Sequence, residues 1–262
     1  MAMKIGKMGE AKSAICTADE TSITIRGKDL CHELMGEKSF TEFFLFLLLG
    51  REPTEDQTFF LDAALVALAE HGLTPSVQAA RMTLAAGPEA FQGAVAASIL
   101  GSGSVVLGSS EAAGSLLVDC LAEAERSGDG FEAVARRMAQ RQRDAGRPLP
   151  GFGHPLHRPV DPRSERLLEL AEQRGVVGDH TRMLLALRSV VGDVWGKPLP
   201  LNVSGAIPAI MLDLDFPREA LKGITILARV AGTVAHLFEE SQRPIGFLLS
   251  YLGGKEIEYD GG

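Results

Sequence analysis

A loop between residues 147 and 163, Arg-Pro-Leu-Pro-Gly-Phe-Gly-His-Pro-Leu-His-Arg-Pro-Val-Asp-Pro-Arg, carries the side chains best suited to chemistry. Proline and glycine punctuate it, and His154 is followed four and nine residues later by Arg158 and Arg163. Binding groups gather on loops, and arginines hold carboxylates and phosphates through paired N–H donors. The loop therefore predicts a site for a ligand that carries phosphates or carboxylates.

Arg163 follows Asp161-Pro162, which places it in the first turn of a predicted helix. At that position a guanidinium and the helix N-terminus can both face an anion. The alternative interpretation is a surface cation paired with Glu165 or Glu169.

Three further residues have a functional and an ordinary interpretation. Arg229 lies in the apolar stretch 224–232, where a charge is costly unless it is paired. It bridges either a buried carboxylate of the protein or a carboxylate of a ligand, and the sequence favours neither. Arg243, before Pro244, has the position of an exposed loop residue. His71, before Gly72, has the position of a residue that caps a helix.

The elements that must position these residues are almost entirely helical. Alanine and leucine dominate, and β-branched alternation is confined to 22–25, which predicts a short strand or hairpin. Gly50 is a stop signal, and Thr54-Glu55-Asp56-Gln57 fits a capping box. We expect an all-α fold with helices over 29–49, 54–71, 75–87, 88–100, 111–125, 131–144, 164–174, 181–191, 206–212, 217–240 and 244–252.

Two stretches rich in small residues and proline interrupt the helical pattern, at 101–110 and 196–205. The first indicates either close helix packing or a hinge, or else a loop that lines a ligand cleft. A basic stretch near residues 136–143 is typical of a solvated helix face.

Composition excludes several classes of protein. The chain has 262 residues and a net charge of −8, which argues against general nucleic-acid binding. Its longest apolar run, 43–49, is far shorter than the roughly 20 residues that cross a bilayer. No N-terminal targeting pattern is visible, so we expect a cytoplasmic protein without membrane contact. The three cysteines, Cys16, Cys31 and Cys120, lack metal-ligand spacing, and we expect no metal site.

Four blocks of sequence, in the right order, carry a resemblance to a known family. The chain resembles the citrate synthase superfamily and, within it, the citryl-CoA lyase branch, which is similar to the lyase module of ATP-citrate lyase. The blocks are Ser13-Ala14-Ile15 with Arg26-Gly27 and 40–50, Pro150-Gly151-Phe152-Gly153-His154 with Asp161-Pro162-Arg163, Leu201-Asn202-Val203 with Ser204-Gly205, and 228–236.

The resemblance implies an all-helical homodimer with the active site between two domains of each subunit. The large domain would comprise 1–105 and 213–262, and the small domain 106–212. A coenzyme A (CoA) thioester would be the substrate, with no tightly bound cofactor. The implied activity is retro-Claisen cleavage of citryl-CoA, or of a related 3-hydroxyacyl-CoA, to acetyl-CoA and oxaloacetate.

The resemblance also implies residue roles. His154 would hydrogen-bond the carbonyl or hydroxyl oxygen of the substrate, and His71 would be a second substrate-binding histidine. Both would be catalytic, and either His154 or His71 would remove the proton of the substrate hydroxyl. The carboxylates would be held by Arg163 and Arg229, together with Arg243 from the partner subunit. The CoA portion would lie near the residues Pro150, Gly151, Phe152, Gly153 and Arg158.

Two positions depart from the family pattern. Val106 stands where citrate synthases have a histidine that stabilises the enol of acetyl-CoA. Ser204 stands where the family has the catalytic aspartate, and an unperturbed hydroxyl is not a base at neutral pH. Cleavage is less impaired by these losses than condensation, which must begin by forming the enol. The alternatives are a condensing enzyme of the citrate synthase type and a pseudoenzyme that binds CoA and carboxylates.

Overall fold

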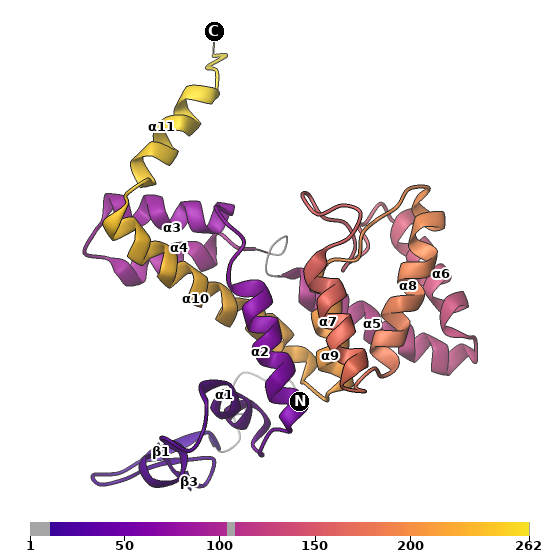
Figure 1. The fold of residues 1–262 in the computed structure, drawn as a ribbon, viewed down its shortest axis with the longest axis horizontal. Helices are drawn as coiled ribbons and strands as arrows, with labels where there is room; N and C mark the ends of the chain where they lie inside the picture. Colours follow the sequence, from indigo (N-terminus) through magenta and orange to yellow (C-terminus); the bar gives the residue numbers. More distant parts are fainter. Residues whose placement is uncertain (1–10, 104–107, 262) are drawn as a thin grey trace. The chain divides into compact units, whose positions relative to one another are not determined.

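The computed structural model describes residues 11–103 and 108–261, and most of them are helical, as Figure 1 shows. The predicted all-α class is confirmed. Val106 lies outside the described residues. The α-helices are α1 (Phe40–Leu49), α2 (Glu55–Ala69), α3 (Pro75–Ala86), α4 (Phe91–Leu100), α5 (Gly108–Ser127), α6 (Phe131–Asp144), α7 (Pro162–Gln173), α8 (Asp179–Trp195), α9 (Val203–Asp213), α10 (Leu221–Gln242) and α11 (Gly246–Glu256).

The chain divides into two compact units, residues 1–59 and 60–262. The first contains a three-stranded antiparallel sheet in the order β1 (Cys16–Ala18), β2 (Ile23–Ile25) and β3 (Lys28–Asp29). The predicted hairpin is therefore confirmed and gains a third strand. Its core contains the buried residues Ile25, Leu34 and Phe46.

The expected single helix over 29–49 is wrong, because the chain forms a π-helical turn at Leu30–Leu34 and then the separate helix α1. Gly36 between them has φ +84°, a left-handed conformation that ends a helix. A new helix begins at Ser39, whose hydroxyl accepts from the Glu42 amide, while the Glu42 carboxylate accepts from the Ser39 amide. Ser39 and Glu42 thus form a second capping box. This local signal was missed because the apolar spacing continues across it.

The other predicted helix signals agree with the structure. Gly50 closes α1 at φ +68°. The Gln57 amide donates to Thr54 Oγ1 at 3.1 Å, and Gln57 Oε1 accepts from the Thr54 amide at 3.0 Å, as a capping box requires. Helix α2 ends at Ala69, so His71 lies beyond it in a short connection.

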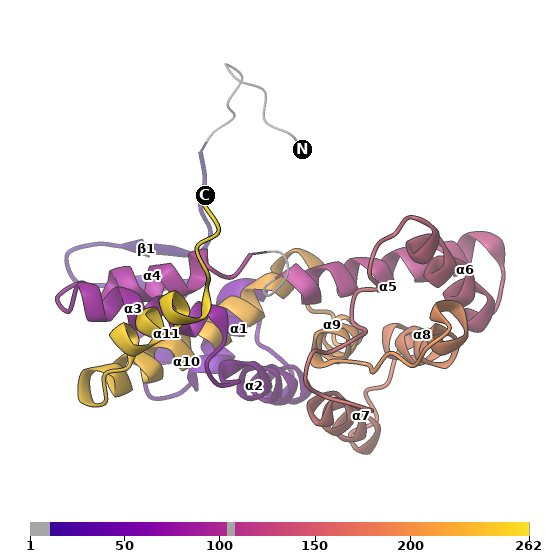
Figure 2. The same ribbon diagram turned by 90° about the horizontal axis from the view of Figure 1, so that it is seen from above.

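Two clusters of buried apolar side chains lie among the described residues of the second unit. One is built mainly from α5, α6, α8 and α9, including the fully buried Met183 and Leu187. These helices lie together in Figures 1 and 2. The other cluster joins α3, α4 and α10 through Ala80, Ala94 and Leu237. The division into a large domain of 1–105 and 213–262 and a small domain of 106–212 stays a prediction.

Among the described residues, the segment 218–242 containing α10 is the one helix long and apolar enough, by length and composition, to cross a membrane. It buries Ile224, Ala228 and Leu237 and contacts α3, α4 and α5. It also carries Arg229 and the buried, ion-paired Glu240. These contacts are those of a core helix, and they place Arg229 within the second unit.

Candidate functional site

A tight turn begins the loop that the sequence singled out. The Phe152 amide donates to the Leu149 carbonyl at 3.2 Å, with Pro150 and Gly151 between them. Gly151 has φ +85°, which is the conformation a type II turn requires after proline. The type II turn therefore explains why proline and glycine stand at positions 150 and 151. Gly153 and His154 follow directly after this turn.

Backbone hydrogen bonds hold this turn against residues 200–205. The Gly153 amide donates to the Pro200 carbonyl at 2.8 Å, and the Asn202 amide donates to the Gly151 carbonyl at 2.9 Å. Asn202 Nδ2 also donates to the Gly153 carbonyl at 2.7 Å. A Cβ on Gly205 would lie 3.0 Å from the Gly151 carbonyl oxygen, so the close approach requires glycine. The two sequence motifs that flank α7 and α8 thus form one structural unit.

The hydrogen bonds of His154 determine its tautomer. Nδ1 accepts from the amides of Leu156 at 3.1 Å and His157 at 3.0 Å. A neutral imidazole that accepts at Nδ1 carries its proton on Nε2. The two shorter bonds at Nδ1 therefore favour a proton on Nε2, against the longer 3.4 Å contact of Nε2 with Arg163 Nη2, which can only donate. His154 also lines a cavity.

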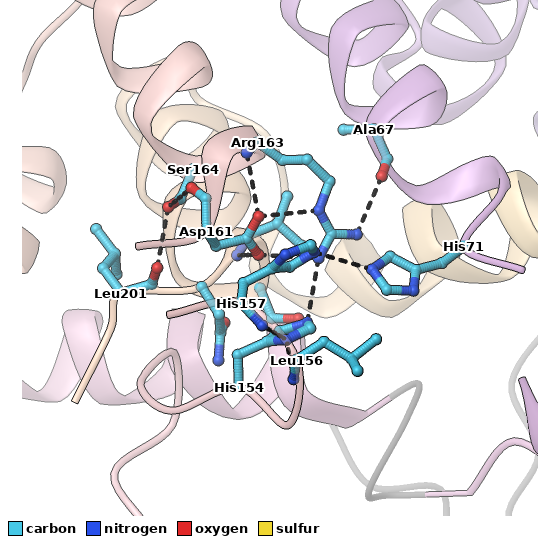
Figure 3. Close-up of polar contacts among 12 residues, drawn as sticks. Ala67, His71, His154, Leu156, His157, Asp161, Arg163, Ser164 and Leu201 are labelled. Carbon is cyan, nitrogen blue, oxygen red and sulfur yellow. Dashed lines mark hydrogen bonds and ion pairs between the residues drawn. The ribbon is translucent and has the colours of Figure 1, made fainter. Parts of the chain in front are cut away.

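Arg163 is paired with Asp161, and neither Glu165 nor Glu169 is its partner. The fully buried Asp161 carboxylate accepts from Arg163 Nε at 3.0 Å and Nη2 at 2.8 Å, and also from the Val203 amide at 3.1 Å. The bonds between Asp161 and Arg163 appear in Figure 3. As predicted, Arg163 lies in the first turn of α7. Burial alone raises the pKa of Asp161, but the bonds from Arg163 and Val203 outweigh it and lower the pKa.

His71 and His154 come together with a third histidine that the sequence interpretation did not assign. Nε2 of His71 lies 3.1 Å from Nε2 of His157, and the His157 ring stacks on His154 with centroids 4.4 Å apart. Figure 3 shows all three rings beside Arg163. The His-x-x-His spacing of 154 and 157 was a visible signal, and only the fold shows that His71 meets it.

Both candidate histidines have lowered pKa values. Burial is the largest cause for each. Arg163 and His157 lower both values further, and Arg229 also lowers the pKa of His71. Both imidazoles are therefore neutral at pH 7, the form in which one nitrogen donates and the other accepts.

The three histidines place one ligand nitrogen each within 4.8 Å of one another, but the set does not suit a metal ion. Nδ1 of His154 already accepts two backbone amides. Nε2 of His154 faces the Arg163 guanidinium at 3.4 Å, and Asp161 holds that cation in place. Only two imidazoles remain as ligands, beside a fixed positive charge.

Arg229 is a partly buried cation with unmet hydrogen-bonding capacity. Among the described residues, its buried Nε has no hydrogen-bond partner. Burial lowers its pKa, and nearby Arg163 adds to the lowering while Glu70 opposes it. A buried donor without a partner is costly, and a ligand carboxylate would satisfy it.

A cavity of about 590 Å³ within residues 60–262 brings these groups together. Ser204, at the start of α9, lines it, and its hydroxyl accepts from Ser109 at 3.0 Å. Ser109 belongs to the glycine- and serine-rich stretch 101–110. Its position in the cavity wall supports the interpretation of that stretch as a loop that lines a ligand cleft. The lining residues are Leu68, His71, Leu73, Thr74, Ser109, Gly153, His154, Pro155, Leu156, Arg163, Asn202, Val203, Ser204, Thr225 and Arg229.

A second cavity of about 550 Å³ shares Gly153 and His154 with the first. Arg158 lines it, opposite the break at 196–205, which contributes Lys197. Sequence interpretation missed Lys197, although it stands between glycine and proline in that break. Two exposed cations beside one loop are suited to phosphate groups.

Arg243 does not line either cavity. It is exposed at the C-terminal end of α10, and its carbonyl accepts from Arg81 Nη2 at 3.1 Å. Arg81 is buried and paired with Glu240 at 2.7 Å and Glu239 at 2.8 Å. The hydrogen bond from Arg81 thus fixes the backbone at Arg243, whereas the Arg243 side chain is exposed and lies outside both cavities.

The fold and the cavities define a mostly helical protein in which histidines and arginines from separate elements share one site. Residues 21–246 match the family model described as citrate synthase, C-terminal domain. The chain belongs to the citrate synthase family.

Known structures and sequences agree with this assignment. The structure is similar to citryl-CoA lyase from Hydrogenobacter thermophilus, with a TM-score of 0.83, 31% identity, and coverage of 96% of this chain and 95% of that one. It is also similar in fold to ATP citrate lyase from Methanothrix soehngenii in complex with citrate and coenzyme A, with a TM-score of 0.78, 19% identity, and coverage of 98% and 43%.

In sequence, the chain is 28% identical to citrate synthase of Deinococcus radiodurans over 222 residues, which are 82% of this chain and 56% of that protein. The chain therefore spans about half the length of the curated relatives it matches.

Proposed function

We propose that the protein cleaves a carboxylate-bearing 3-hydroxyacyl-CoA by a retro-Claisen reaction, with citryl-CoA as the first candidate substrate. The observation that carries the proposal is the shared cavity of His71, His154 and Arg229, in which Ser204 replaces the family aspartate. The likeness to citryl-CoA lyase, at 31% identity over nearly the whole chain, supports the same direction of reaction.

Each group in the cavity has a role in this reaction. Nε2–H of His154 would donate to the substrate oxygen, and Arg229 would hold a carboxylate through its unpartnered Nε. Arg163 would offer a second carboxylate the edge of its guanidinium that does not contact Asp161, where Nη1 now makes a long 3.4 Å bond to the Ala67 carbonyl. Arg158 and Lys197 would attract the phosphates of CoA in the neighbouring cavity. The CoA thioester is the substrate, and the reaction needs no other cofactor.

The chemistry balances without a further reactant. His71 takes the proton of the substrate hydroxyl, and the electron pair of that O–H bond forms the carbonyl of oxaloacetate. The carbon–carbon bond breaks, and its electron pair becomes the enolate of the thioester. A proton then returns to the enolate carbon and gives acetyl-CoA. Cleavage begins with removal of a proton from the hydroxyl oxygen of the substrate. It therefore depends less on a carboxylate base at position 204.

The condensing direction starts at carbon and needs that base. Its loss costs about 10²–10⁴-fold in rate, or about 3–5 kcal/mol in the barrier. The Ser109–Ser204 pair offers only hydroxyl groups at this position. This observation favours cleavage over condensation, and it equally favours a second candidate, a pseudoenzyme that binds CoA and carboxylates without turnover.

Incubation with citryl-CoA tests the proposal, with acetyl-CoA release followed over time. We expect turnover by the wild-type protein and its loss in His154→Ala. Tight CoA binding without turnover would instead support the pseudoenzyme. Ser204→Asp provides a matched variant, because we expect it to increase exchange of the acetyl-CoA methyl protons with deuterated water. Equal exchange in both proteins would argue against Ser204 as the reason for a preferred direction.

We also propose a homodimer in which Arg243 of one subunit completes the site of the other. Supporting observations are its exposure outside both cavities and the exposed apolar side chains near it. Phe238 on α10 is 62% exposed, and Phe247 and Tyr251 on α11 are 71% and 65% exposed. Phe247 and Tyr251 lie four residues apart on one face of α11, and exposed apolar side chains of this size suit an interface with a second copy.

A further inference from the structure

His157 lies at the centre of the three imidazoles, yet the proposed reaction leaves it without a role. Its Nε2 is 3.1 Å from Nε2 of His71, and the two rings meet nearly edge-to-face at 76°. Its ring also stacks on His154, with an interplanar angle of 30°. It thus contacts both histidines of the cavity, although it does not itself line that cavity.

The direction of the hydrogen bond between His157 and His71 follows from the role proposed for His71. At 3.1 Å, one of the two Nε2 atoms must carry the proton and the other must accept it. Removal of the substrate proton needs an unprotonated Nε2 on His71, so the proton of its neutral ring is on Nδ1. The lone pair of His71 then lies on Nε2, and Nε2–H of His157 donates to it.

We propose that His157 is a positioning residue that holds His71 in the Nδ1–H tautomer and occupies its Nε2 lone pair until the substrate hydroxyl takes that place. The inference rests on the proposed function for the identity of the incoming group. In the proton-transfer step the substrate O–H breaks and an N–H bond forms at His71 Nε2, while His157 keeps its own proton.

The surroundings of His71 explain why such a donor is useful. Arg163 from α7 and Arg229 from α10 both face the ring and disfavour its charged form, as does His157, while Glu70 accepts from the His71 amide at 2.8 Å. A neutral ring with a free lone pair would be satisfied only by water. The N–H of His157 fixes the ring orientation, and the stack on His154 fixes His157 in turn.

Nitrogen-15 chemical shifts of His71 in the unmodified protein give the first test, because they report its tautomer without any turnover. We expect the Nδ1–H form, with Nε2 as a hydrogen-bonded acceptor. A proton on Nε2 of His71 would overturn the proposal. Absence of citryl-CoA cleavage would overturn the proposed function and leave this result intact, so the two failures are distinguishable.

Two substitutions of His157 supply the second test. His157→Gln keeps an N–H donor near the position of Nε2, whereas His157→Phe keeps a stacked ring without the donor. We expect His157→Phe to raise the pKa of His71 by about half to one unit, since one hydrogen bond of ordinary strength is lost. The acid limb of the kcat/KM profile should move to higher pH by the same amount, and His157→Gln should restore it.

Equal behaviour of the two variants, in the pKa of His71 or in the pH profile, would show that the donor has no positioning role. A purely structural role would lower stability in both variants and leave the tautomer of His71 unchanged. Thermal unfolding of each variant, measured beside the nitrogen-15 spectra, separates these results.

Discussion

At the scale of single residues, the site depends on which polar atoms are already satisfied. Asp161 pairs with the Nε and Nη2 of Arg163, and His154 Nδ1 is satisfied by two backbone amides. The Nε of Arg229 is buried without a partner among the described residues. Unmet buried capacity marks the place where a ligand contributes most, because the ligand removes a cost that the free protein bears.

Arg229→Met tests this view. We expect it to weaken a carboxylate ligand such as citrate by about 2–5 kcal/mol and to leave CoA binding nearly unchanged. The free protein should become no less stable, because a partly buried cation whose Nε has no partner among the described residues is removed while the aliphatic stem is kept. Calorimetric titration and thermal unfolding measure both effects.

Arg166→Met is the control for that experiment, because Arg166 is exposed and pairs with exposed Glu169. Equal weakening of citrate and CoA by Arg229→Met would contradict its assignment to the carboxylate. Arg163→Met is less informative, since it also leaves the buried Asp161 unpaired.

At the scale of elements, the N-terminus of α7 connects the segments that form the site. Asp161 caps α7 through the Arg163 amide and accepts from the Val203 amide at the start of α9. Ser164 Oγ adds a bond to the Leu201 carbonyl at 3.0 Å. One buried carboxylate thus joins the loop, the arginine and the helix that carries Ser204.

Asp161→Asn should lower the free energy of unfolding by about 3–5 kcal/mol, since it leaves the charge of Arg163 without its partner. Glu169→Gln, at an exposed pair, should change it little. Chemical denaturation at neutral pH compares the variants. A small effect of Asp161→Asn would show that the contacts of Asp161 with Arg163 and Val203 do not stabilise the fold.

The same carboxylate predicts a pH dependence of stability. The pKa of Asp161 is lower in the folded protein than in the unfolded chain. Its stabilisation is therefore fully present above the unfolded pKa of about 3.9 and is lost as pH falls through the folded pKa. In acid, the stability difference between wild type and Asp161→Asn should narrow, and a constant difference below pH 4 would contradict the assignment.

At the scale of the whole molecule, the proposed dimer connects the exposed end of α10 with the site. Phe247→Glu combined with Tyr251→Lys should give a monomer in light scattering after size-exclusion chromatography, and cleavage should fall with it. Arg243→Ala should leave the dimer intact and still reduce activity. A wild-type monomer, or full activity of Arg243→Ala, would contradict the shared site.

Much of the fold was predictable because its signals are local. Thr54 with Gln57, Pro75 and Gly50 each act within one helical turn, so sequence alone locates those helix ends. The single helix expected over 29–49 failed because apolar spacing does not register the left-handed conformation at Gly36. His71 was predicted to end its helix and lies two residues beyond it.

What the sequence by itself determined is the helical class and the Pro-Gly turn, and it predicted a binding site that includes His154 and Arg163. Only the tertiary structure decided that Arg163 is paired with Asp161, that the Nε of Arg229 has no hydrogen-bond partner in the part of the chain that the structure describes, and that His157 contacts His71. Spacing along a chain specifies which turn or helix forms, whereas these three contacts join residues through the packing of different elements. A pairing over 86 positions, such as that of His71 with His157, has no local signal.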